Sequence, residues 1–388
     1  MKFKCASSDL QSCISVVEKA ISQRTSLQVL ENLYIEVKNN KLTMRGNDLE
    51  IGIQNVIPVS DVQTEGSILV KSKTLSSITS KLSNQSLDVE VGENNKMVIR
   101  AGKVAFDILC LSVDEYPAFP SIETGVGFKL KVSELKELIK HTIFAVSFDE
   151  TKQFLNGVLV KHDNGLLNFV STDGYRLSIK NKSMENLERD FSAIVPYKAM
   201  NEIGKIIQQM DASQEVSLNV SDSQVAFSVG DLFLISRVTK GQFPDYNQVL
   251  PKETTSEFNI PRRFLIDASE RASIIATASN NVVRLVFNDG SLSINANAAS
   301  LGDFKEDIDI TRVRGEGEIK VAFNVRLILD VIKTVDGDDL VIKLNNGLSP
   351  CVIKAVNDET YNYVVMPIRT NEYQEKKEVV GTEPAVSA

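Results

Sequence analysis

Two patterns of apolar and polar residues alternate along this chain. Apolar residues at helical spacing predict six amphipathic helices, and short stretches of one-by-one alternation predict antiparallel strands. Helices packed on such strands make an α+β protein. The expected helices span residues 10–21, 73–82, 132–146, 198–210, 264–276 and 324–335.

The order of these elements repeats three times. Phe3, Phe128 and Phe258 each precede the first helix of a copy, and a pair of strands around a polar turn follows that helix. Each copy also repeats internally, because a further strand leads into a second helix and more short strands. We therefore predict three structurally repeated domains, each of two β-α-β-β-β units. Their expected boundaries are 1–124, 125–253 and 254–369, followed by residues 370–388, which lack any period and are expected to be a disordered tail.

Composition narrows the class of protein. The 388 residues are 43% hydrophobic and 24% charged, which is ordinary for a globular protein. No stretch approaches the ~20 apolar residues of a membrane helix, and the amino terminus does not read as a signal peptide. The four cysteines are scattered without a CxxC pair, so neither a disulfide framework nor a zinc site is expected. We predict a cytoplasmic protein without a metal, a cofactor or a membrane partner.

Charge gives a further indication. The whole chain has a formal net charge of -8, yet none of the six helical segments is net negative when the residues at their ends are included, that is over 9–24, 72–82, 133–146, 198–210, 262–278 and 324–335. Simple solvation explains any one charged helix face. That all six are neutral or basic in an acidic chain instead favours one surface that faces a polyanion.

Catalytic motifs are missing from the sequence. There is no phosphate-binding GxxxxGK[ST] loop, no strand-linked GxGxxG, no GxSxG and no HExxH. His141 and His162 fall on a predicted helix and near a hairpin turn, where a surface or helix-lining role is the usual one. Modules that read a base sequence are also absent, so any nucleic acid would be bound through its backbone.

One turn stands out from the rest. In Ser171–Leu177, Asp173 and Gly174 break a strand, because Asp bonds its own backbone and Gly accepts positive φ. We expect Tyr175 and Arg176 to be exposed on its rim, a combination common in protein-binding hot spots. A decorated hairpin turn is the plainer interpretation. Two distant stretches, residues 241–246 and 363–369, favour the interpretation as a protein-binding site.

These three stretches, together with residues 46–50, 249–251 and 323–325, resemble the family of bacterial sliding clamps, the beta subunits of DNA polymerase III. The similarity runs from residue 1 to about residue 369. It implies a head-to-tail homodimer in which each chain forms half of a closed ring, with helices inside and sheets outside. Such a ring encircles duplex DNA without sequence specificity and acts as a non-catalytic processivity factor. Its implied partners are the replicative polymerase, the clamp loader and other proteins with a clamp-binding motif.

Three sets of site residues follow. The resemblance implies DNA contacts at Arg24 and Lys198, and the helix charges add Lys73, Lys81, Lys205, Arg262 and Arg263. The resemblance implies that the seam between two copies joins Phe106 and Ile108 to Ile274 and Ile275, with Lys103 beside Asp303 or Glu306. It also implies a peptide pocket between domains two and three, formed by Leu155, Thr172, Gly174, Tyr175, Arg176, Leu177, Pro244, Val249, Asn324, Leu348, Pro350, Val364, Val365, Met366, Pro367, Ile368 and Arg369.

Two other classes of protein stay open at this point. A triplicated α+β enzyme or ligand-binding protein would use a site at Ser171–Leu177, and the missing catalytic motifs count against it. A purely structural scaffold would leave the neutral or basic charge of the six helices unexplained.

Overall fold

The computed structural model describes residues 1–370 except Gln23, Arg24, Ser26, Ser83, Asn84, Glu93, Glu123 and Asn186. The expected tail therefore lies outside the described residues from Asn371 on, and so does the expected DNA contact Arg24. The chain divides into two compact units. The first contains residues 1–139, 160–165 and 185–240, and the second contains residues 140–159, 166–184 and the chain from Gly241 on.

The predicted order of elements is confirmed. Within the described residues, six successive groups each contain a strand, a helix and three strands, and β5 and β22 are the additional strands. The helices are α1 (Ser7–Val17), α2 (Ser72–Thr79), α3 (Val132–Lys140), α4 (Tyr197–Ile207), α5 (Arg262–Ala276) and α6 (Val325–Thr334).

Helix α3 ends earlier than its apolar period predicts. The prediction ran to residue 146, but α3 stops at Lys140 and a short 3-10 turn follows at Ile143–Ala145. The carbonyl groups just beyond the helix have other partners: Ser178 donates its hydroxyl to the carbonyl of His141, and Ser171 donates to that of Thr142. Together with the Ala145 N–H, which also donates to the Thr142 carbonyl, these bonds satisfy the two carbonyls that follow the end of the helix.

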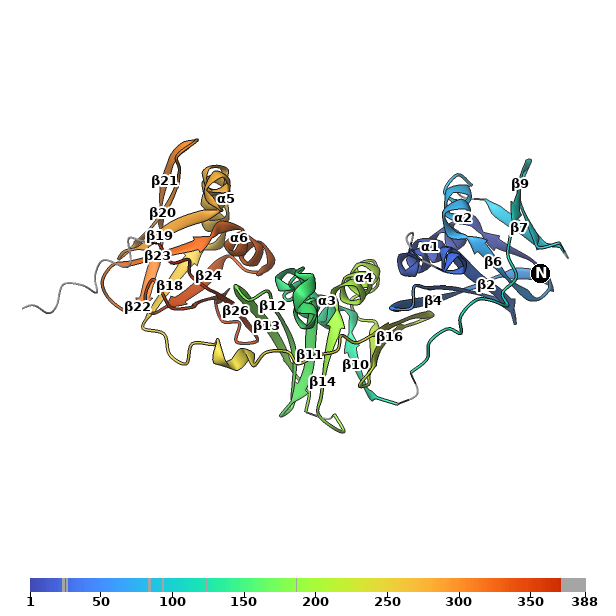
Figure 1. The fold of residues 1–388 in the computed structure, drawn as a ribbon, viewed down its shortest axis with the longest axis horizontal. Helices are drawn as coiled ribbons and strands as arrows, with labels where there is room; N and C mark the ends of the chain where they lie inside the picture. The colour runs from blue at the N-terminus through green and yellow to red at the C-terminus, as the bar shows by residue number, and fades with distance from the viewer. Residues whose placement is uncertain are drawn as a thin grey trace, which may run out of the picture. The chain divides into compact units, whose positions relative to one another are not determined.

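The first unit contains two antiparallel sheets, seen with their helices in Figure 1. One has the order β5-β1-β7-β8-β9 and the other has the order β10-β15-β16-β17-β4-β3-β2-β6. The strands of the first sheet are β1 (Lys2–Ala6), β5 (Ser60–Thr64), β7 (Ser86–Val91), β8 (Lys96–Ala101) and β9 (Val104–Leu109). Those of the second are β2 (Asn32–Lys38), β3 (Lys41–Asn47), β4 (Ile51–Pro58), β6 (Gly66–Lys71), β10 (Val126–Lys131), β15 (Glu215–Val220), β16 (Gln224–Val229) and β17 (Leu232–Arg237).

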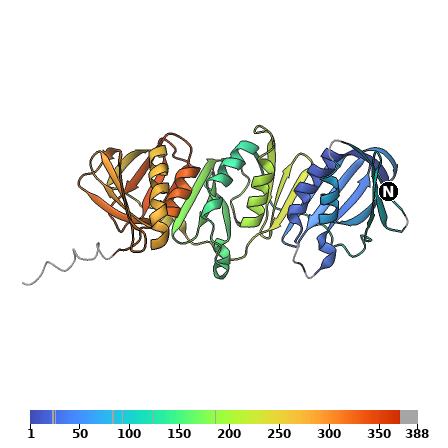
Figure 2. The same ribbon diagram turned by 90° about the horizontal axis from the view of Figure 1, so that it is seen from above.

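Helices α1 and α2 lie side by side in this unit (Figure 2). Leu10, Ile14 and Val17 recur at helical spacing on α1 and are buried. Gly46 on β3 permits the close approach of α1, because a Cβ at that position would lie 2.7 Å from the Val17 carbonyl oxygen. The strand β14 (Phe191–Pro196) also belongs to this unit, whereas β11 (Gly157–Asp163) contributes residues to both units.

The second unit also has two antiparallel sheets. Within it, one sheet has the order β12-β13-β26-β25-β24-β18-β22, and the other has the order β21-β20-β19-β23. The strands of the first are β12 (Leu166–Thr172), β13 (Arg176–Ser183), β18 (Ser256–Pro261), β22 (Thr311–Arg314), β24 (Asp339–Leu344), β25 (Cys351–Ala355) and β26 (Tyr361–Val365). Those of the second are β19 (Val282–Phe287), β20 (Ser291–Ala298), β21 (Gly302–Asp309) and β23 (Ile319–Asn324).

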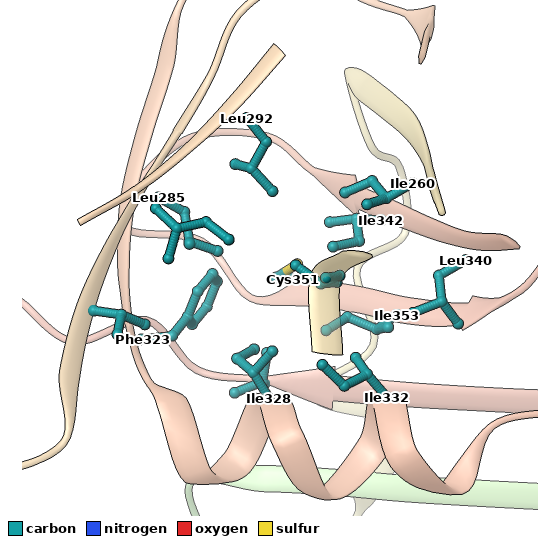
Figure 3. Close-up of a cluster of buried hydrophobic side chains, with 14 of the residues drawn as sticks. Ile260, Leu285, Leu292, Phe323, Ile328, Ile332, Leu340, Ile342, Cys351 and Ile353 are labelled. Atoms are coloured by element: carbon teal, nitrogen blue, oxygen red, sulfur yellow. The ribbon is translucent and has the colours of Figure 1, made fainter. Parts of the chain in front are cut away.

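A continuous apolar core holds the second unit together. Figure 3 shows Ile328 and Ile332 of α6 pointing toward Phe323, Ile353 and the other side chains of the two sheets. The rings of Phe258 and Phe287 pack in the same core with centroids 4.8 Å apart. Fully burying a side chain of this kind stabilises the fold by about 1.5–3 kcal/mol. The core includes Tyr361, Tyr363 and Val365 of β26, the strand that pairs with β13 beside the candidate site.

No helix in the described part of the chain is long and apolar enough to cross a membrane.

Candidate functional site

The turn at Asp173 has the conformation that the sequence predicts. The Asp173 carboxylate oxygen Oδ1 accepts hydrogen bonds from the backbone N–H groups of Tyr175 at 2.9 Å and Arg176 at 3.0 Å. Gly174 has a φ of +92°, which glycine adopts without steric cost. The Tyr175 side chain is 69% exposed, as expected for the rim of the turn.

Arg176 differs from its prediction, because its side chain is only 9% exposed. The guanidinium group bonds Asp173 at 3.0 Å and Asp330 of α6 at 2.5 Å, and it donates to the Phe144 carbonyl at 2.7 Å. It also lies over the Phe144 ring, 5.4 Å from the centroid. Arg176 is therefore an anchor between β13, α6 and the chain after α3, and it is wrong to expect it exposed on the rim.

The electrostatics of this anchor are balanced. Burial disfavours the charged form of Arg176, but Tyr363, Asp330 and Asp173 outweigh that effect and raise its pKa. The guanidinium keeps its charge, and each of its partners keeps a hydrogen bond with it. Buried charges are tolerated under these conditions only.

A pocket of about 260 Å³ lies beside the turn, entirely within the second unit. The backbone N–H of Met366 donates to the Tyr175 carbonyl at 2.9 Å, which holds the end of β26 against the turn. Another part of the pocket wall is a short 3-10 turn, Tyr246–Gln248, which begins where the Asp245 side chain accepts a hydrogen bond from the Asn247 backbone N–H. The lining residues come from three distant parts of the chain: Leu155, Thr172, Gly174, Arg176, Leu177, Pro244, Asp245, Tyr246, Val249, Val364 and Met366.

Nine of the expected pocket residues are among these lining residues, and eight are not. Val365 packs in the core instead, because it points to the opposite face of β26 from Val364. Asn324 accepts from the Arg326 backbone and caps α6. Ile368 donates its N–H to the Ala322 carbonyl at 2.7 Å. The other five are Tyr175, Leu348 and Arg369, which are exposed, and Pro350 and Pro367, which are half-buried.

Two lining residues, Asp245 and Tyr246, are missing from the sequence-based set. Both stand in the stretch 241–246 that the sequence singles out, so the signal was present. The cavity is largely apolar where Leu155, Leu177, Val364 and Met366 meet. Such a surface suits short apolar side chains, and a methionine adapts its shape to several of them.

The expected DNA contacts fall into two groups. Lys73, Lys81 and Arg263 are exposed and make no ion pair with any residue that the structure describes. Lys198 instead bonds Asp48, and Lys205 bonds Glu202 at 2.9 Å.

Arg262 belongs to the engaged group, because it donates to the carbonyls of Ile332 and Lys333 at the end of α6. Arg326, on the first turn of α6, is exposed and forms no ion pair within the described residues. It is a cation that the sequence-based set missed, although it lies in a predicted helix.

Most of the expected seam residues lie on β9 and β21, each the end strand of its sheet, or on helix α5. β9 ends the five-stranded sheet, with Phe106 half-buried and Ile108 only 7% exposed. Ile274 on α5 is 69% exposed, while Ile275 packs against the core of its unit.

The charged residues expected at the seam differ in their surroundings. On β21, which ends the four-stranded sheet, Glu306 bonds Arg271 at 2.5 and 2.8 Å, and this interaction lowers the pKa of the Glu306 carboxylate. Asp303 accepts a hydrogen bond from Asn297 but forms no ion pair within the described residues. Lys103 is exposed.

Comparison with known proteins covers nearly the whole chain. Residues 1–120, 129–245 and 247–369 match the family descriptions of the N-terminal, central and C-terminal domains of the DNA polymerase III beta subunit. The chain is 32% identical to the beta sliding clamp of Synechocystis sp., covering 95% of this chain and 99% of that protein. It is 30% identical to the beta sliding clamp of Bacillus subtilis, covering 95% and 100%.

Solved structures give the same result. The chain superposes with a TM-score of 0.91 on the Pseudomonas aeruginosa sliding clamp solved with griselimycin, at 26% identity, covering 95% of this chain and 100% of that one. The sliding clamp of Bacillus subtilis gives a TM-score of 0.89 at 29% identity, covering 95% and 99%.

Proposed function

This chain belongs to the family of DNA polymerase III beta subunits, the bacterial sliding clamps, and is a processivity factor; we propose that two copies close head to tail around duplex DNA and that the pocket beside Met366 takes partner peptides. The convergence of three distant segments on one apolar pocket carries the peptide part of the proposal. The partners are the replicative polymerase, the clamp loader and other proteins with a clamp-binding motif. The chain acts in the cytoplasm as a non-catalytic accessory subunit.

The three domains of this proposal are residues 1–124, 125–253 and 254–369. The ranges of the three family matches, 1–120, 129–245 and 247–369, support this division. The six β-α-β-β-β groups also divide into three pairs at these boundaries.

The proposed seam joins β9 of one copy to the β21 and α5 region of the second copy. Exposed apolar groups support it, because Ile274 and the β9 residues Val104 and Leu109 are 69%, 43% and 83% exposed in the single chain. Both strands end their sheets, so both have a free edge for pairing. Lys103 pairs with Asp303 in this proposal, since Arg271 already engages Glu306.

DNA contact in this proposal rests first on Lys73, Lys81 and Arg263. Their charges are available to phosphates without breaking an existing ion pair. Lys198, Lys205 and Arg262 also contact DNA in this proposal, but phosphate must compete with Asp48, Glu202 and the α6 carbonyls for these three side chains. Contacts of this kind recognise the phosphate backbone of DNA, and the binding affinity that they give falls as the salt concentration rises.

A retention experiment tests the ring. Loaded by its clamp loader onto a nicked circular duplex, the protein should stay bound at raised salt and should dissociate after the circle is cut. A ring is held by topology, whereas a groove-binding protein is held by charge alone. Equal retention on cut and uncut circles would contradict the proposal, and turnover of a small substrate would favour the alternative of a triplicated enzyme.

A further inference from the structure

The turn that frames the peptide pocket has a second copy in the first unit. There, Asp48 Oδ1 accepts hydrogen bonds from the backbone N–H groups of Glu50 at 3.0 Å and Ile51 at 2.8 Å. This is the pair of bonds that Asp173 accepts in the pocket turn. The two turns therefore have the same local geometry with different side chains.

The neighbouring strand has the same position as well. The Arg237 backbone N–H donates to the Glu50 carbonyl at 3.0 Å, as that of Met366 donates to Tyr175 at 2.9 Å. β17 also pairs with β4 in the same antiparallel register in which β26 pairs with β13. Arg237 thus stands where the pocket has Met366.

A smaller cavity of about 120 Å³ lies beside the Asp48 turn and the end of β17, and we name it the first-junction groove. Its walls are more polar than those of the peptide pocket. Glu50 and Arg237 are exposed on it, and neither forms an ion pair with a described residue. The groove is lined by Asn47, Leu49, Glu50, Ile51, Gly52, Ala118, Pro120, Gln224, Ile235, Ser236 and Arg237.

The apolar floor of the peptide pocket is missing here. Gly52 occupies the place of Leu177, and a Cβ on Gly52 would lie 3.1 Å from the Phe119 ring and 3.2 Å from Pro120. Phe119 and Pro120 thus fill the space that a larger side chain at position 52 would need. A peptide that depends on apolar burial does not find that burial in this groove.

Leu49 adds an independent observation. It has a φ of +74° and its side chain is 42% exposed, at the position where the other turn has Gly174. Leucine is strained in that conformation, and the fold leaves a large part of this apolar side chain in contact with solvent. Strain of this kind is found at sites that bind something.

We infer that the first-junction groove is a second ligand site, which takes an extended peptide with one apolar residue between an acidic and a basic side chain. Arg237 binds the acidic side chain, Glu50 binds the basic one, and Leu49 contacts the apolar residue. Opposite charges in these places give orientation and selectivity. The volume of the groove limits it to a short segment. The inference concerns a site separate from the peptide pocket and does not depend on the function proposed for that pocket.

The probe is the tripeptide N-acetyl-Glu-Leu-Lys-amide, added at millimolar concentration to the full-length ¹⁵N-labelled protein. We expect shifts of the backbone amides of residues 48–52 and 236–237, with a dissociation constant on the order of a millimolar. Arg237→Gln and Glu50→Gln should each weaken binding at least fivefold. The matched controls Lys240→Gln and Asp231→Asn, which change exposed charges outside the groove, should bind like wild type.

Leu49→Gly separates binding from folding. It removes strain, so thermal stability should stay equal or rise, while affinity for the tripeptide should fall. The absence of amide shifts at residues 48–52 would overturn the inference. It would equally be overturned if the two charge variants and the two controls bound the tripeptide alike.

Discussion

A guanidinium nitrogen of Arg176 lies 2.5 Å from a carboxylate oxygen of Asp330, although 154 positions separate the two residues in the sequence. This contact joins the turn after β12 to helix α6. The pocket turn is therefore held in place by an ion pair, in addition to its own backbone bonds.

Removing this anchor should destabilise the second unit. Arg176→Ala leaves Asp173 and the Phe144 carbonyl without their partner, and we expect the free energy of unfolding to fall by about 2–4 kcal/mol. Urea unfolding measures this value. Arg369→Ala, which removes an exposed arginine, is the control and should change it by less than about 0.5 kcal/mol. Equal effects of the two substitutions would contradict the anchor.

The pocket predicts a contrast between two apolar side chains. Met366 lines the cavity, whereas Leu348 is 54% exposed and lies outside its lining. Met366→Ala should weaken the binding of a polymerase-derived peptide by about 1–3 kcal/mol, because truncating a side chain that contacts the peptide in its pocket costs this much binding free energy. Leu348→Ala should leave the affinity unchanged. Fluorescence anisotropy of a labelled peptide gives both values, and a stronger effect of Leu348→Ala would place the site elsewhere.

The seam predicts a change in mass. Ile274→Ala combined with Ile275→Ala should shift the dimer toward monomer in sedimentation, because the closed ring contains the altered contact twice. Lys103→Asp and Asp303→Lys should each weaken the dimer, and the two together should restore part of the loss. A wild-type chain that sediments as a monomer at micromolar concentration would remove the basis of the ring.

The unpaired cations should dominate the salt dependence of DNA binding. Lys73→Ala, Lys81→Ala and Arg263→Ala should each reduce the slope of log affinity against log salt by about 1. Arg262→Ala should change this slope less, because its guanidinium already bonds the α6 carbonyls. Titrations of a short duplex at several salt concentrations make the comparison. Equal slopes for all four variants would mean that existing bonds do not limit phosphate contact.

Burial predicts unreactive thiols. It raises the pKa of Cys5 and of Cys13 to about 12, and it also raises the pKa of Cys110 and Cys351. At pH 8 a thiol with that pKa is only about 10⁻⁴ ionised, against roughly a quarter for a free cysteine. A thiol-reactive dye should therefore label the native protein slowly and label all four cysteines quickly in denaturant. Rapid labelling of Cys5 or Cys13 in the native protein would show that the amino-terminal strand and α1 open readily.

Local chemistry made part of the site predictable. The Asp173 turn follows from an Asp that bonds its own backbone and a Gly that accepts positive φ, and both features stand next to each other in the sequence. The six helices follow from apolar period in the same way. Such elements depend on neighbours in the chain, so a sequence contains what is needed to predict them.

Other features depend on distant partners and were not predictable in this way. Arg176 resembles an exposed rim residue until Asp330 and Phe144 are brought beside it. Likewise, Val364 and Val365 both stand in the stretch 363–369, and the pairing of β26 with β13 and β25 decides which of the two side chains faces the pocket. α3 ends where serines of β12 and β13, which are distant in the sequence, bond the carbonyls that follow it.

The position of β26 has a consequence for incompletely translated chains. β26 is the final strand of the described chain, yet it lies between β13 and β25 within its sheet. A polypeptide released before Tyr361 would have no Val364 or Met366 and would leave the β13 edge open. Only a chain translated through Met366 can thus display the pocket, so partner binding distinguishes such chains from shorter translation products.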